Sequence, residues 1–184
     1  MKIDLEQVQL HAMLLDPTQR DEGFRRLMAM YGDRIYWHIR RIVVGHDDAE
    51  DVLQETCISI LSAIDSLRAS DRLIVWIYSI ATHESLRHLR RQTRLFQSID
   101  ALGPVLMDML GAENPIDGQE VEMAFQKALL TLPTQQRIVF NMRYYDDMTY
   151  EEIAAVTGKN VGTLKTNYHY ASEKIRKYIK DHSL

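Results

Sequence analysis

Residues 149–177 read TYEEIAAVTGKNVGTLKTNYHYASEKIRK, and the pattern predicts two short helices joined by a tight turn. Thr149 and Glu152 have the spacing of a capping box, in which each side chain bonds the backbone N–H of the other residue, so the first helix begins there. Gly158 follows the last apolar position of that helix, and glycine most easily takes the left-handed conformation that ends a helix. Asn160 is the expected cap of the second helix.

The second helix of this stretch has one apolar and one polar face. Its apolar side chains recur at spacings of three and four, namely Val161, Leu164, Tyr168, Ala171 and Ile175. The opposite face carries side chains that can hydrogen-bond: Thr163, Lys165, Thr166, Asn167, His169 and Tyr170. A helix-turn-helix with such a second helix is the arrangement that enters a DNA major groove. The alternative is an ordinary helical hairpin with a solvated face, because capping boxes and glycine stops are common.

The composition is that of a soluble globular protein with one or two domains. Of the 184 residues, 46% are hydrophobic and 26% are charged. No apolar run approaches the ~20 residues that span a membrane, and the first residues lack a signal-peptide core, so we expect a cytoplasmic protein. The single cysteine, Cys57, rules out an intramolecular disulfide and a cysteine-based zinc site. Its apolar-periodic surroundings favour a buried structural thiol.

Charge is segregated along the chain, so the total of −4 is misleading. Residues 1–95 have a net charge of −1, residues 96–122 have −6 and no base, and residues 123–184 have +3. The C-terminal segment is therefore the basic part of the chain. Because its excess of positive charge is small, we expect the isolated protein to bind DNA weakly.

The remaining periodic segments all read as helices, and no strand pattern of comparable length occurs. We expect helices over about 5–15, 22–44, 74–94, 120–130 and 135–144, and one from Asp47 or Asp48 to about Leu67. In that last helix the side chains expected to face inward are Val52, Ile58, Leu61 and Ile64.

The segment between these helical groups has a different character. Residues 97–119 contain Gly-Pro and Asn-Pro pairs and acidic residues but no base, which is typical of a flexible linker. The expected fold class is therefore all-α, with two small helical domains, residues 1–95 and 122–184, joined by a flexible acidic linker at 96–121. The linker permits both a compact and an extended arrangement of the two domains.

An acidic stripe lies on the helix that begins near residue 47. Asp48, Asp51 and Glu55 are spaced i, i+3, i+7 and so share a face, which Gln54 extends. Carboxylates near a helix start suit the positive end of its dipole. A stripe of this kind is also a docking surface for a basic helical partner. Calcium binding is disfavoured, because a continuous helix cannot wrap its ligands around an ion.

A basic face lies on the helix expected over 74–94. It consists of His83, Arg87, Arg90, Arg91 and Arg94. Glu84 is the only acid on that helix, so local acids leave the arginines nearly unpaired, which favours a track for DNA phosphates over a merely solvated face. Trp76 and Tyr78, at the start of the helix, are candidates for the core.

The sequence contains no pattern that indicates catalysis. His83 and His88 are one residue too far apart for the zinc-protease motif, and five helical steps put them on different faces. No nucleophile has a recognisable partner, and no glycine-rich phosphate loop occurs. We therefore expect no enzyme, metal, cofactor or small-molecule substrate.

With these residues in view, the chain resembles a bacterial RNA polymerase sigma factor of the extracytoplasmic-function (ECF) group, group IV of the sigma-70 family. DDAEDVLQET at 47–56 and VWIYSIATHESLRHLRR at 75–91 resemble the polymerase-binding helix and the promoter-melting helix of that family. Residues 129–176 resemble its helix-turn-helix domain, which reads the minus-35 element. The resemblance extends from Phe24 to Tyr178 and implies two helical domains in that order.

The resemblance also implies roles for individual residues. Docking on the clamp coiled coil of the largest polymerase subunit would use Asp48, Asp51, Gln54 and Glu55. Capture of an unstacked minus-10 base would use Ser70, Asp71, Arg72, Leu73, Trp76 and His83, and the adjacent backbone would be held by Arg87, Arg90 and Arg91. The minus-35 major groove would face Thr163, Lys165, Thr166, Asn167, His169 and Tyr170, with Lys174 and Arg176 on phosphates.

The partners that the resemblance implies are core RNA polymerase (its clamp coiled coil and flap), promoter DNA and an anti-sigma factor, which often sits at the inner membrane. The linker would thread toward the RNA exit path. The chain departs from the family at His83, where Asn is frequent, and at Asn167, Tyr170 and Ser172, where Arg is frequent. We therefore expect an altered promoter preference.

Two other functional classes remain open at this point. One is a stand-alone helix-turn-helix regulator that binds duplex DNA as a dimer. The acidic stripe, the second basic helix and the long linker argue against it, since a dimeric repressor needs none of them. The other is an interaction protein that mimics a sigma factor or sequesters a partner, which the thinned basic residues of the second helix would suit.

Overall fold

The computed structural model describes residues 5–67, 72–93, 107 and 120–182, and within these residues all regular structure is helical. The helices are α1 (Leu5–Leu15), α2 (Arg20–Val43), α3 (His46–Ala63), the short 3-10 helix η1 (Ile64–Ser66), α4 (Leu73–Gln92), α6 (Glu120–Leu130), α7 (Thr134–Tyr144), α8 (Tyr150–Thr157) and α9 (Val161–His182). The all-α fold class is confirmed. Most of the linker expected at 96–121, like Ser70, Asp71 and Arg94, lies outside the described residues.

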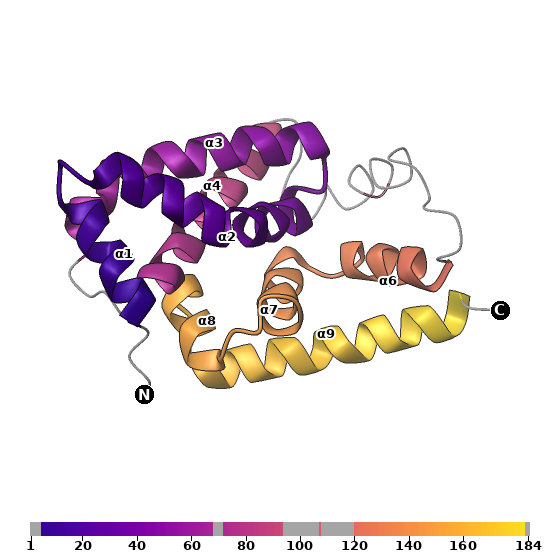
Figure 1. Cartoon of the computed structure of the whole chain (residues 1–184). Coiled ribbons are helices and arrows are strands. Elements are labelled where there is room, and N and C mark those ends of the chain that lie inside the picture. Colours follow the sequence, from indigo (N-terminus) through magenta and orange to yellow (C-terminus); the bar gives the residue numbers. More distant parts are fainter. Residues whose placement is uncertain (1–4, 68–71, 94–106, 108–119, 183–184) are drawn as a thin grey trace.

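The N-terminal half is a bundle in which α2, α3 and α4 contact one another and α1 crosses α2 (Figure 1). Its fully buried side chains include Leu27, Ile35, Ile39, Val52, Ile60, Ile77, Ala81 and Leu89. These positions recur at helical spacing, so each helix contributes one apolar stripe to a common core. Trp37, in contrast, is 53% exposed on α2.

The inward face of α3 differs from the one expected. Val52 and Ile64 are buried, but Ile58 and Leu61 are 64% and 37% exposed. The buried face of the helix instead follows Ala49, Val52, Thr56 and Ile60. Thr56 can occupy a core position because its hydroxyl donates to the Val52 carbonyl at 2.7 Å, which satisfies the buried polar group.

The C-terminal half packs α6 and α7 along the long helix α9, with α8 crossing at its N-terminal end (Figure 1). The expected capping box is present, because Thr149 Oγ1 accepts from the Glu152 N–H at 3.2 Å and Glu152 Oε2 accepts from the Thr149 N–H at 2.7 Å. Gly158 ends α8 with a φ of 68°, in the left-handed region. Asn160 Oδ1 then accepts from the Thr163 N–H at 2.8 Å, which caps α9.

The two halves pack against each other, with α8 against α4 and α7 against α2 (Figure 1). One hydrophobic core runs through both halves, so Ile138, Met142, Ile153 and Leu164 of the C-terminal half belong to the same buried cluster as the N-terminal bundle. The sequence permits both a compact and an extended arrangement of the two helical units, and the structure shows the compact one.

A buried polar network also joins the halves. His38 Nδ1 of α2 lies 2.7 Å from Asp146 Oδ2, in the turn between α7 and α8, and His38 Nε2 lies 2.9 Å from Thr82 Oγ1 of α4. The His38 and Asp146 side chains are only 1% and 3% exposed. Arg41 adds a contact of 3.3 Å to Asp146 Oδ1. Because a buried charge is costly unless it is paired, these contacts hold the halves together at a defined point.

Candidate nucleic-acid interface

The helix α4 has a buried face and a face of aromatic and basic side chains. Leu73, at the start of α4, is completely buried. Its neighbour Arg72, which was also expected to help capture a minus-10 base, is exposed. Trp76 is half-buried, and His83 and Arg90 are exposed. The helix thus brings an indole, an imidazole and a guanidinium to its outer surface.

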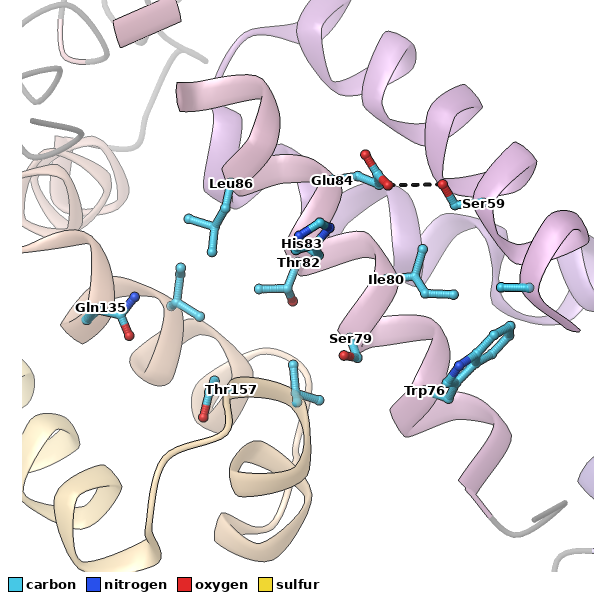
Figure 2. Close-up of a pocket in the computed structure, with 13 residues that line it drawn as sticks. Ser59, Trp76, Ser79, Ile80, Thr82, His83, Glu84, Leu86, Gln135 and Thr157 are labelled. Carbon is cyan, nitrogen blue, oxygen red and sulfur yellow. Dashed lines mark hydrogen bonds between the residues drawn. The ribbon is translucent and has the colours of Figure 1, made fainter. Parts of the chain in front are cut away.

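This surface of α4 forms one wall of a cavity of about 420 Å³ between the two halves (Figure 2). The cavity is lined from α4 by residues that include Trp76, Ser79 and His83, and from the C-terminal half by Ile138, Val156 and Thr157. The C-terminal half, through α7 and α8, therefore lies across the cavity from the side of α4 that carries Trp76 and His83, and His83 remains exposed there.

Two of the arginines of α4, Arg87 and Arg91, are paired with acids, so the expectation that the arginines are nearly unpaired is wrong for these two. Glu55 Oε2, on the neighbouring helix α3, accepts from Arg91 at 2.7 Å and from Arg87 at 2.8 Å. Arg87 also lies 2.7 Å from the buried carboxylate of Glu84. The hydrogen bonds from Arg91 and Arg87 lower the pKa of Glu55 to about 2. The sequence of α4 alone could not reveal a partner that α3 supplies.

The acidic stripe of α3 is divided by the same packing. Asp48 Oδ1 lies 3.0 Å from His88 Nε2, and Asp48 Oδ2 accepts from Gln92 at 3.1 Å. Asp48 and Glu55 therefore both face α4. Asp51 and Gln54 are exposed on the same helix. Two of the four expected docking residues thus already have partners within the chain.

The polar face predicted for the helix-turn-helix lies on α9. Thr163, Lys165, Thr166, His169 and Tyr170 are exposed and Asn167 is half-buried, while Leu164, Ala171 and Ile175 are buried beneath them. Farther along α9, Lys174 Nζ donates to Gln136 Oε1 at 3.3 Å, and Arg176 pairs with Glu173. The helix therefore presents a continuous row of donors and acceptors of the kind that reads base edges.

The described residues contain no group of three or more His, Cys, Asp or Glu side chains placed to hold a metal ion. Cys57 is half-buried rather than buried, with its Sγ 3.9 Å from Met28 Sδ. Burial raises the pKa of the Cys57 thiol. None of the helices described is both long and apolar enough to cross a membrane.

Sequence reasoning missed the polar residues that join the halves, His38, Thr82 and Asp146. His38 and Asp146 are separated by 108 positions. No local pattern links them, because their pairing depends on how two independently predicted helical units pack.

Two family models match this chain: "Sigma-70 region 2" over residues 27–95 and "Sigma-70, region 4" over residues 122–175. Together they cover well over half of the chain. The chain belongs to the sigma-70 family. The first match contains α3, most of α2 and all of α4, and the second contains α8 and most of α9, so the two candidate DNA-facing helices of this sigma factor, α4 and α9, lie wholly and largely inside matched regions.

Curated relatives place the sigma factor in the ECF group. It is 26% identical over 169 residues to the ECF RNA polymerase sigma factor SigW of Bacillus subtilis, with 87% of this chain and 90% of that protein covered. It is 28% identical over 174 residues to the ECF RNA polymerase sigma-E factor of Escherichia coli K12, with 89% and 91% covered. As an ECF sigma factor it directs promoter recognition and transcription initiation.

Solved structures share the fold. The sigma factor RpoE in complex with the anti-sigma factor NepR from Bartonella quintana superposes with a TM-score of 0.71 at 23% identity, covering 86% of this chain and 98% of that one. CnrH in complex with the cytosolic domain of CnrY gives a TM-score of 0.70 at 21% identity, covering 98% and 100%.

Proposed function

We propose that this sigma factor uses α3 to dock on core RNA polymerase, α4 to hold the minus-10 element and α9 to read the minus-35 element, in the cytoplasm and without catalysis of its own. The observation that carries the proposal is the presence of two helices with DNA-binding faces, α4 and α9, in a chain that also exposes an acidic docking helix. A self-sufficient regulator that binds duplex DNA needs neither a second DNA-contacting helix such as α4 nor an acidic docking helix such as α3.

The residue roles follow from chemistry and exposure. Asp51 and Gln54, which are exposed on α3, would make the first contacts with the clamp coiled coil of the polymerase, and Asp48 and Glu55 would extend that surface. Trp76 offers an aromatic face on which an unstacked base can stack, which every base permits. His83, about two turns farther along the same face of α4, would set the preference for the captured base.

The backbone and major-groove contacts would fall to the remaining polar residues. Arg87, Arg90 and Arg91 would bind phosphates next to the captured base. The polar face of α9 would read the minus-35 base edges through Lys165, Asn167 and His169, and Lys174 and Arg176 would fix its register on the phosphates. The absence of a row of arginines on this face predicts a modest DNA affinity for the free chain.

The compact arrangement supports a further part of the proposal. Because α7 and α8 lie across the cavity from Trp76 and His83, separation of the two halves would give a DNA strand fuller access to this side of α4. An inactive compact state is what an anti-sigma factor would bind. We accordingly propose an anti-sigma factor as a partner of this chain, which the two complexes that share its fold also contain.

Run-off transcription tests the proposal directly. Core polymerase from the source organism is incubated with fragmented genomic DNA, with and without the protein, and new start sites are mapped. We expect new defined starts with a shared upstream sequence, and their loss in the double variant Asp51→Ala, Gln54→Ala, whose binding to core should fall at least tenfold. A variant of Asp47, exposed on the same helix, serves as the control, with Asp47→Asn expected to retain the starts.

The outcomes separate the functional classes. New starts that require Asp51 and Gln54 support the sigma factor mechanism proposed here. Core binding without new starts would contradict it in favour of a protein that sequesters polymerase. No core binding, together with tight and specific duplex binding by the free chain at physiological salt, would contradict it in favour of a dimeric regulator.

A further inference from the structure

A ladder of polar contacts runs along the α3–α4 interface and joins two surfaces that the proposed function keeps separate. Ser59 of α3 donates to Glu84 Oε1 at 3.0 Å, and Glu84 Oε2 lies 2.7 Å from Arg87. Glu55 binds Arg87 and Arg91, and Asp48 binds His88 and Gln92. The acids proposed to dock on polymerase and the arginines proposed to bind DNA are therefore partners of each other in the free chain.

Glu55 is the centre of this ladder. Both arginines donate to the same oxygen, Oε2, so one carboxylate holds two guanidinium groups. Arg87 and Arg91 are 48% and 46% exposed and Glu55 is 33% exposed, so all three also remain within reach of a partner. We call Glu55, Arg87 and Arg91 the clasp.

We propose that the clasp couples polymerase docking to DNA binding: a basic side chain of the polymerase that takes Glu55 releases Arg87 and Arg91 for DNA phosphates. The inference rests on the proposed function and deepens it, since it assigns Glu55 to both surfaces. A carboxylate oxygen that accepts from a polymerase arginine or lysine has fewer acceptor sites for α4. Arg91 then faces solvent without the carboxylate that it pairs with in the free chain, whereas Arg87 loses Glu55 and keeps its contact of 2.7 Å with Glu84.

The coupling must work in both directions. If binding of polymerase raises the affinity of α4 for DNA by some factor, binding of DNA must raise the affinity of α3 for polymerase by the same factor, because coupling between sites is reciprocal. Removal of the two arginines also frees Glu55, so we expect it to raise the affinity for polymerase too. The expected factor is modest, about three- to tenfold, since exposed ion pairs contribute little individually. The clasp therefore adjusts affinity and does not act as an all-or-none switch.

The first arm of the test uses the full-length free chain and a fluorescent single-stranded oligodeoxythymidine of fixed length, with binding followed by anisotropy. We expect Glu55→Gln to bind about three- to tenfold more tightly than the wild type, because it releases Arg91 and removes one of the two acids that hold Arg87. The slope of the logarithm of affinity against the logarithm of salt concentration should steepen by about 0.7, the value for one additional phosphate contact. Asp47→Asn removes the same charge from an exposed position of α3 outside the ladder, and should change the affinity by less than about twofold.

The same arm is repeated in the background Arg87→Gln, Arg91→Gln, where Glu55→Gln should give no gain. If Glu55→Gln bound the oligonucleotide no more tightly than Asp47→Asn does, or if it still bound more tightly when both arginines are replaced, the effect would be one of net charge. Either result would contradict the proposed role of the clasp. Far-UV circular dichroism of every variant establishes that the helices are intact.

The second arm measures binding to core polymerase. Arg87→Gln, Arg91→Gln should bind core about three- to tenfold more tightly than the wild type, and this gain should vanish in the Glu55→Gln background, because the gain arises from freeing that carboxylate. A wild-type chain that fails to bind core contradicts the proposed function. A wild-type chain that binds core but shows no gain on loss of the arginines contradicts the clasp alone.

Discussion

At the residue scale, Glu55 shows how one side chain links charge to stability. Its two hydrogen bonds from arginines hold its pKa at about 2, below the ordinary value of 4.5. A depressed folded-state pKa means that the ionised form is stabilised by folding. The stabilisation is therefore fully present above about pH 4.5 and is lost as the pH falls toward 2. Because Glu55 and both arginines are partly exposed, water screens the pair and the contribution is small.

We therefore predict a pH-dependent stability difference between the wild type and Glu55→Gln. The wild type should be more stable by up to about 1 kcal/mol near neutral pH, and the difference should shrink to nothing between about pH 4.5 and pH 2. Urea unfolding followed by circular dichroism at several pH values measures it. A difference of the same size at pH 2.5 as at pH 7 would show that the carboxylate charge is not its source.

At the scale of elements, the turn between α8 and α9 requires a left-handed backbone conformation at Gly158. Gly158 has a φ of 68°, and a Cβ built there would meet nothing within 4 Å. Any cost of a side chain at this position is therefore conformational and not steric. Gly162 lies in the first turn of α9, where a Cβ would make an ordinary contact of 3.4 Å with Asn160 Oδ1.

Two alanine substitutions should consequently have opposite effects on stability. Gly158→Ala should lower the free energy of unfolding by about 1–2 kcal/mol, the cost of the left-handed conformation for a residue with a Cβ. Gly162→Ala should raise it by up to about 1 kcal/mol, because glycine is a poor helix former. Chemical denaturation of the two variants in parallel measures both. If both variants lost the same free energy of unfolding, the left-handed φ of Gly158 would not be the reason that this turn requires glycine.

The elements that the sequence predicted well are those with local signals. The helix-turn-helix was predicted with its capping box, its glycine stop and its Asn160 cap because each signal involves residues at most four positions apart. The inward face of α3 was predicted wrongly at Ile58 and Leu61, since hydrophobicity alone cannot show that Thr56 satisfies its hydroxyl within the helix and takes a core position. The pairing of Arg87 and Arg91 with Glu55 was missed for a related reason, because Glu55 lies on another helix.

At the scale of the whole molecule, the packing of the two halves is what the sequence could not predict. The contact between His38 and Asp146 joins positions 108 residues apart, and the shared core depends on the relative placement of two units that local sequence patterns predict separately. The role of the packing is nonetheless clear from the site. Since the C-terminal half lies across the cavity from Trp76 and His83, we expect the balance between closed and open arrangements to influence how much free chain can bind promoter DNA.

The substitution Asp146→Asn should shift this balance toward the open arrangement. It removes the charge that pairs with His38 and Arg41 at the interface, and loss of a buried charged partner costs about 1–3 kcal/mol. Because the cost falls on the contact between the halves, the helices of each half should persist. We expect unchanged far-UV circular dichroism, a larger radius of gyration in small-angle X-ray scattering, and several-fold tighter binding of a promoter fragment.

Asp147→Asn is the matched control, since Asp147 is exposed, carries the same charge, and has a φ of 53° that asparagine tolerates. If Asp146→Asn left both the radius of gyration and the DNA affinity at the values of Asp147→Asn, the buried network would not be what holds the halves closed.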